Sequence, residues 1–142
     1  MLGVDNDRRQ TNGGRSVDIL IELTKGFEDD LQQLSLEERE NIEEKVDHCA
    51  GLFFTNQALM YGDLEHLPFP GQLNGYDSSL YAFSVSPDLR VILAIDEDPI
   101  FDQVIFTLFR VVQWEHLHKA HQAVANSLYE EISPQDKSAL LV

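Results

Sequence analysis

Two arginines and two histidines in the second half of the chain have the side chains best suited to chemistry. Arg90 and Arg110 lie in apolar stretches, and His118 and His121 follow in the last helical pattern. An arginine is a permanent cation that clamps a phosphate or carboxylate with two N–H groups, whereas a histidine acts as base or acid near neutral pH. Cleavage of RNA by its own 2′-hydroxyl needs a base, an acid and positive charge at the phosphate. The four residues supply these groups, although spacing alone does not bring them together.

Each of these residues also has a purely structural interpretation. Arg90 could pair with a nearby aspartate or with a glutamate near the C-terminus, and Arg110 could form a salt bridge to a helix. His121 falls on an apolar helical stripe, which is typical of a buried histidine. His118 falls at the edge of that stripe and is freer to act. Both interpretations stay open for all four residues.

No metal or cofactor motif stands out. Glu115 and His118 are three residues apart, as in carboxylate-bridged di-iron helices, but the chain lacks the second such helix that those sites need. It has no phosphate-binding glycine loop, nucleophile elbow or CxxC pair. We therefore expect no cofactor and no metal. The single cysteine, Cys49, has apolar neighbours and is predicted to be a buried structural thiol.

The charge balance limits the partners. The chain has 142 residues, enough for one domain, with a formal net charge of -15. An acidic domain repels a polyanion except at a local basic spot, so RNA or a ribosome is a disfavoured partner and a basic protein a favoured one. No apolar run is long enough to span a membrane, and the N-terminus lacks a signal-peptide pattern. With one cysteine, these features predict a cytoplasmic protein without a membrane partner.

The N-terminal half predicts a strand and two helices. Residues 1–16 are polar and predict a disordered leader. Alternating apolar residues over 17–23 predict a half-buried strand. A helix is expected to begin after Thr24, and the capping box Ser35-Leu36-Glu37-Glu38 begins a second helix that is expected to end near Gly51. The two helices predict a helical hairpin on one face of a sheet.

The C-terminal half predicts three strands and one helix. Residues 52–67 suit either a short helix or an apolar loop, and 68–77, with two prolines and two glycines, suit an irregular connection. Three β-rich runs with short turns fill 80–112, so they are expected to be antiparallel neighbours. A helical stripe over 115–132 closes the domain, and 133–142 are expected to be a flexible tail.

The predicted architecture is one α+β domain over residues 17–132. Its antiparallel sheet combines the first strand with the three-strand meander, and the N-terminal helical hairpin and the C-terminal helix pack on it. This order, with three sequence stretches, resembles the RelE/ParE superfamily of small bacterial toxins. The stretches are LNGYD from Leu73, LYAFSVSPDLRVILAID from Leu80 and VIFTLFR from Val104. The resemblance extends over about residues 17–130.

The resemblance implies a function and assigns roles to residues. Many members are ribosome-dependent mRNA endonucleases, others poison gyrase, and a co-expressed antitoxin usually neutralises them. Arg90 would grip the scissile phosphate, Arg110 matches the basic residue at the end of the last strand, and His118 and His121 lie near the family's late aromatic or histidine group. The lysines that active nucleases carry before the meander are missing here, and the net charge has the opposite sign.

These departures leave two hypotheses for the function. The first is a toxin-like component of a toxin–antitoxin system, an endoribonuclease whose activity is weak or lost, with an antitoxin protein as partner. The alternative is a non-catalytic protein-interaction module on the same scaffold.

Overall fold

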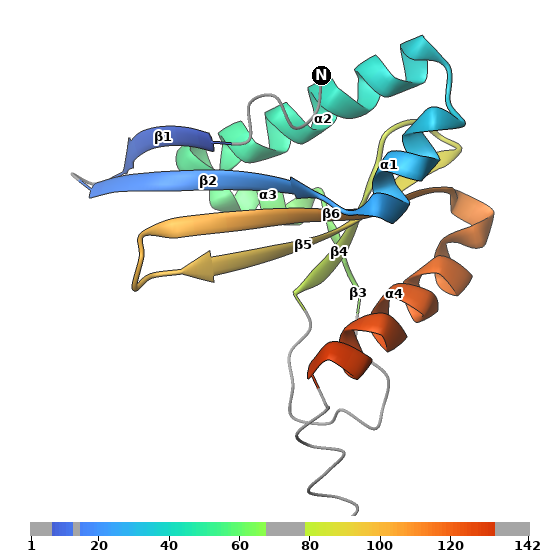
Figure 1. Cartoon of the computed structure of the whole chain (residues 1–142). Coiled ribbons are helices and arrows are strands. Elements are labelled where there is room, and N and C mark those ends of the chain that lie inside the picture. Colours follow the sequence, from blue (N-terminus) through green and yellow to red (C-terminus); the bar gives the residue numbers. More distant parts are fainter. Residues whose placement is uncertain (1–6, 13–14, 68–78, 133–142) are drawn as a thin grey trace, which may run out of the picture.

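In the computed structural model, the chain folds into a sheet with helices on both faces (Figure 1). The structure describes residues 7–12, 15–67 and 79–132. The sheet has six strands in the order β1-β2-β6-β5-β4-β3. The strands are β1 (Asp7–Asn12), β2 (Arg15–Leu23), β3 (Glu65–Leu67), β4 (Leu80–Ser84), β5 (Leu89–Asp98) and β6 (Gln103–Gln113). The helices are α1 (Lys25–Gln32), α2 (Leu36–Thr55), α3 (Gln57–Gly62), the 3-10 turn η2 (Trp114–His116) and α4 (Leu117–Ile132). The predicted α+β class is confirmed.

The sheet is mixed. The predicted meander is present, with β4, β5 and β6 as antiparallel neighbours. The first strand was expected to be antiparallel as well, but β2 runs parallel to β6, from the pair Asp18↔Gln103 to the pair Leu23↔Leu108. Parallel neighbours need a long crossover connection. Here that connection contains all the intervening helices and strands, so the sequence pattern of either strand alone could not show the direction of pairing.

The expected disordered leader contains an edge strand. β1 pairs antiparallel with the first part of β2, from Asp7↔Leu20 to Asn12↔Arg15. Its sequence, DRRQTN, has no apolar alternation, so hydrophobic periodicity could not reveal it. Its pairing with β2 defines the strand. The remaining leader residues 1–6 and 13–14, the expected irregular connection 68–77 and the expected tail 133–142 lie outside the described residues.

Three boundaries differ from the expectation. α2 continues past Gly51 to Thr55, because Phe53, which is 4% exposed, extends its buried face by another turn. The ambiguous stretch 52–67 ends α2 and then forms both the short helix α3 and the short strand β3. The last helix begins at Leu117, after η2, rather than at Glu115.

The sheet divides the core into two unequal parts. The larger part packs α1, α2 and α3 against one sheet face, and its fully buried side chains include Phe27, Ile42, Val46, Met60 and Phe106. The smaller part packs α4 against the other face, mainly through Ala120, Val124 and Ala125 on Leu80, Ile92 and Ala94. Burial of a large apolar side chain contributes about 1.5–3 kcal/mol, and an alanine contributes much less. α4 is therefore attached less firmly than the helices on the opposite face.

Replacement of Gly51 by alanine is expected to raise the free energy of unfolding by about 0.5–1 kcal/mol. A glycine in a helix interior costs that much relative to alanine, and a Cβ at Gly51 would meet nothing within 4 Å. At Gly26, a Cβ would lie 3.3 Å from the Phe109 carbonyl oxygen and from Arg110 Cδ. Gly26→Ala should therefore gain less than Gly51→Ala in urea unfolding. Equal gains would contradict the close packing of α1 on β6.

Candidate functional site

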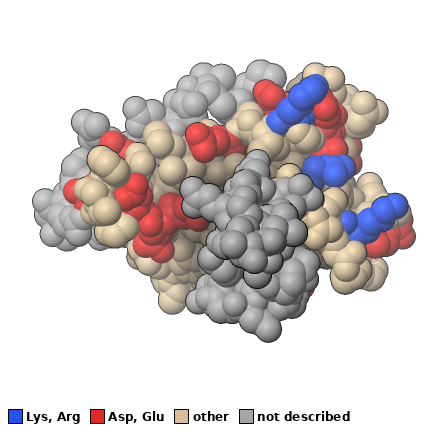
Figure 2. Space-filling model, turned by 60° about the horizontal axis from the view of Figure 1, so that its bottom comes forward, with Lys and Arg blue, Asp and Glu red and all other residues tan. Residues whose placement is uncertain are grey.

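A groove between the end of β6 and the start of α4 gathers basic side chains. Its volume is about 410 Å³, and it is lined by Arg110, Val111, Val112 and Gln113 of β6 with His116, Lys119, Ala120 and Ala123. None of these described lining residues is acidic, although the chain has 25 aspartates and glutamates. On the face drawn in Figure 2, the visible lysines and arginines lie at one end with acidic residues beside them, and acidic residues without basic neighbours lie at the other end. We call this feature the basic groove.

A β-bulge at Phe109 places Arg110 at the groove. Ile92 of β5 faces Arg110, and its neighbour Leu93 faces Leu108, so Phe109 is the extra residue. A bulge bends its strand and re-aims the side chains that follow it.

Asp30 of α1 binds the bulged segment. Its Oδ2 accepts hydrogen bonds from Arg110 Nε at 2.7 Å and from the Val111 N–H at 2.8 Å, and its Oδ1 accepts from Arg110 Nη2 at 3.2 Å. The Asp30 side chain is 18% exposed and that of Arg110 38%. The hydrogen bonds to Asp30 raise the pKa of Arg110 above its already high ordinary value, so the guanidinium stays charged. Arg110 thus forms a salt bridge to α1, as the structural interpretation of this residue expected.

The start of α1 is tied to the same strand. Thr24 caps the helix by accepting from the Phe27 N–H at 3.2 Å. Its hydroxyl also donates to the carbonyls of Leu108 and Phe109, at 3.0 and 3.2 Å, and its N–H donates to Leu108 O at 3.1 Å. The absence of a side chain at Gly26 lets the two segments approach this closely. The N-cap of α1 and Asp30 in its second turn therefore hold both sides of the bulge.

Arg90 lies outside the basic groove. Its Nη1 donates to the carbonyls of Ser86, Pro87 and Leu89, at 2.9, 3.2 and 3.0 Å. The guanidinium thus supports the turn between β4 and β5. The structural alternative had an acidic partner for Arg90, but the hydrogen bonds found are to backbone carbonyls.

The two predicted histidines are also not among the groove residues. His118 is exposed, whereas His121 is partly buried on the inner side of α4. Of the predicted set, only Arg110 lines the groove, and it is joined there by His116 and Lys119. His116 is 65% exposed, and its Nε2 lies 3.8 Å from Oε1 of Glu115. The catalytic roles of Arg90, Arg110, His118 and His121 stay predictions.

The sequence contained a signal for the two added residues. His116, Lys119 and Ala123 follow each other at intervals of three and four, which places them on one side of a helix. β6 ends at Gln113, three residues before His116, so the chain has only a short distance in which to turn. The side of the helix with His116, Lys119 and Ala123 therefore lies beside the end of β6, which carries Arg110. The groove therefore offers a permanent cation, an ammonium and an imidazole to an anionic ligand.

Metal and thiol chemistry have little support in the described residues. Among them, no group of three or more His, Cys, Asp or Glu side chains could hold a metal ion. Cys49 is 8% exposed, as predicted for a structural thiol. Burial, with a smaller contribution from the charge of Asp63, raises the pKa of its thiol to about 12. The thiol is therefore protonated at neutral pH and a poor nucleophile.

Replacement of Asp30 by alanine is expected to lower the free energy of unfolding by about 2 kcal/mol, since it removes charge-assisted bonds and leaves the Val111 N–H without its acceptor. Asp29→Ala is the matched control. Asp29 is 57% exposed and pairs with Lys25, which is 87% exposed, so its loss should cost at most about 0.5 kcal/mol. Urea unfolding of both variants tests this, and equal losses would contradict the role of Asp30.

The Cys49 thiol gives the stability an alkaline dependence. Its pKa is raised from 9.0 to about 12 on folding, so above pH 9 the unfolded chain binds fewer protons than the folded one. Stability is complete below pH 9 and falls as the pH rises towards 12. The free energy of unfolding should therefore fall more steeply between pH 9 and 11 in the wild type than in Cys49→Ala. Parallel slopes would show that the thiol does not contribute.

In the described part of the chain, no helix is both long and apolar enough to cross a membrane. No family model, curated protein or solved structure matches the chain. The function must therefore be argued from the groove and its surroundings.

Proposed function

We propose that the chain is the toxin-like component of a toxin–antitoxin pair, that the basic groove is its RNA-binding site, and that its endoribonuclease activity is weak or lost. The observation that carries the proposal is the set Arg110, His116 and Lys119 in a groove without described acidic lining residues. Phosphate binding by a protein depends on such local positive charge. At the groove, a domain whose net charge is -15 offers local positive charge to a polyanion.

The groove also has the groups for phosphodiester chemistry. His116 could exchange a proton with the attacking or leaving oxygen, and Lys119 could offset charge on the phosphate. Arg110 is a less effective clamp than a free arginine, because two of its N–H groups already bind the Asp30 carboxylate. This partial neutralisation supports binding with slow or no cleavage.

A non-catalytic interaction module is the second candidate. It is favoured by the fact that both arginines assigned by the resemblance have structural hydrogen bonds, Arg110 to Asp30 and Arg90 to the turn carbonyls. Such a module would bind a protein partner and leave RNA intact.

Lys119→Ala is expected to weaken binding of a single-stranded RNA and to lower the slope of log Kd against log salt by about 0.7, as expected for one lost phosphate contact. Lys45→Ala is the control, because Lys45 is exposed on α2 and does not line the groove. Fluorescence anisotropy at several salt concentrations measures both. An unchanged slope in Lys119→Ala, or an equal change in Lys45→Ala, would place RNA elsewhere.

High expression of the chain is expected to slow bacterial growth, because even weak cleavage then depletes RNA, and His116→Ala should relieve the effect. Loss of a general acid or base lowers a rate by about 10²–10⁴-fold. His118→Ala should leave the effect unchanged, because that exposed side chain is not among the groove residues. Growth curves and RNA cleavage in vitro provide the measurement. Relief by His118→Ala but not by His116→Ala would favour His118, the residue that the resemblance indicates. Normal growth with intact RNA would favour the interaction module.

A further inference from the structure

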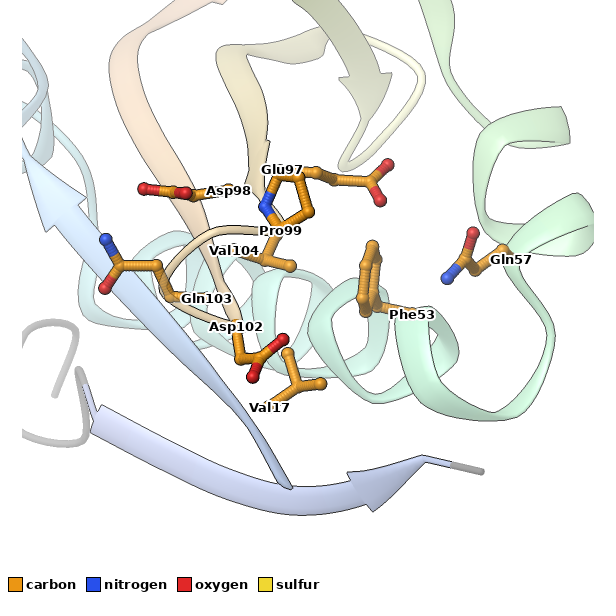
Figure 3. Close-up of a pocket in the computed structure, with 9 residues that line it drawn as sticks. All are labelled: Val17, Phe53, Gln57, Glu97, Asp98, Pro99, Asp102, Gln103 and Val104. Atoms are coloured by element: carbon orange, nitrogen blue, oxygen red, sulfur yellow. The ribbon is translucent and has the colours of Figure 1, made fainter. Parts of the chain in front are cut away.

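A second pocket lies at the opposite end of β6 from the basic groove. Its volume is about 440 Å³, and the strand that separates the two features extends for roughly 25 Å between Gln103 and Arg110. The lining comes from three parts of the fold: Val17 of β2, Phe53 and Gln57 of the helical layer, and Glu97, Asp98, Pro99, Asp102, Gln103 and Val104 around the β5–β6 turn. Figure 3 shows the Phe53 ring near the middle, with the carboxylates of Glu97 and Asp102 on opposite sides of it.

The charge of this pocket is wholly negative. Three of the nine described lining residues are acidic and none is Lys, Arg or His. Glu97 Oε2 accepts one hydrogen bond from the Tyr61 hydroxyl at 3.1 Å. A carboxylate has about four acceptor positions, so Glu97 can still accept from a ligand. The field extends beyond the pocket: burial raises the pKa of Tyr81, and the charges of Glu97 and Asp96 raise it further.

The turn beside the pocket presents apolar side chains to solvent. Ile100 is 83% exposed and Phe101 72%. Their backbone is fixed, because Asp98 Oδ1 accepts hydrogen bonds from both of their N–H groups, at 3.1 and 3.3 Å. The Asp102 carbonyl also accepts from the Asp18 N–H at 3.0 Å, which ties the turn to β2. A fixed turn binds a partner with a smaller loss of conformational entropy than a mobile one.

We propose that this pocket and the Ile100–Phe101 tip form a docking surface for a basic segment of another protein. An arginine or lysine of that segment enters the pocket, where it pairs with the carboxylates of Glu97 and Asp102. An apolar side chain next to it covers Ile100 and Phe101. Charge complementarity selects this occupant, because nucleic acid would be repelled by the carboxylates. The proposal does not depend on RNA binding in the basic groove.

The test is an NMR titration of the ¹⁵N-labelled chain with the peptide acetyl-LRLRLRL-amide, and with acetyl-LELELEL-amide as control. The basic peptide should shift the amides of residues 97, 98 and 100–104, Phe53 and Gln57, and the acidic peptide should not. Raised salt should weaken binding, since the contact is ionic. Glu97→Gln/Asp102→Asn neutralises the two carboxylates that contact the basic side chain while keeping their size, and Glu97→Gln can still accept the hydrogen bond from Tyr61. We expect Kd to rise about tenfold.

Two matched variants separate this surface from general acidity and stickiness. Glu40→Gln/Glu44→Gln removes two charges from the exposed side of α2 and should leave Kd within about twofold. Phe101→Ser should weaken binding, whereas Leu36→Ser, at a side chain that is 68% exposed, should not. The proposal would be overturned by shifts spread over α2, by equal binding of the acidic peptide, or by equal effects of the two double variants.

Discussion

The carboxylate of Asp30 connects the helical layer to the sheet at the point where the sheet is irregular. A β-bulge interrupts the ladder between β5 and β6 at Phe109, and the N–H of Val111 and the side chain of Arg110 follow it. Asp30 accepts hydrogen bonds from both, across 80 residues of sequence. Because Thr24 binds the carbonyls on the other side of the bulge, the direction of α1, the bend of β6 and the entry into α4 are fixed together. The basic groove exists because this segment is held in place.

The same contact limits what the groove can do. An arginine that clamps a phosphate must direct its paired N–H groups at the ligand, and Arg110 directs Nε and Nη2 at Asp30. Lys119 has no carboxylate among the described lining residues, and the carboxylate near His116, that of the exposed Glu115 at 3.8 Å, lies outside the lining. The charge of Arg110 therefore stabilises the fold, whereas the charge of Lys119 is exposed to a ligand. Binding of an anion can survive this division better than rapid catalysis, which needs a cation placed on the reacting phosphate.

Features that depend on short sequence intervals could be predicted, and those that depend on distant partners could not. The capping box is confirmed, with Glu38 N–H to Ser35 Oγ at 3.1 Å and Ser35 N–H to Glu38 Oε1 at 3.0 Å. The meander is also confirmed. It could be predicted because apolar alternation and short turns are local features of the sequence. The edge strand β1 pairs with its neighbour in sequence, β2, but its polar sequence has no apolar alternation that could reveal it. The parallel pairing of β2 with β6 depends on a backbone partner far along the chain. Arg110 was identified as a candidate, but its pairing with Asp30 and its proximity to Lys119 depend on the bulge and on η2.

β6 places two surfaces of opposite charge at its two ends. Gln103 and Val104 line the acidic pocket, and Arg110 to Gln113 line the basic groove. The two surfaces lie farther apart than the Debye length of about 8 Å at physiological ionic strength, so a ligand at one surface is largely screened from the charge of the other. The overall acidity of the chain therefore does not decide which partner binds at either end. The two proposed partners, a polyanion at one end of β6 and a basic protein segment at the other, would therefore not compete for the same surface.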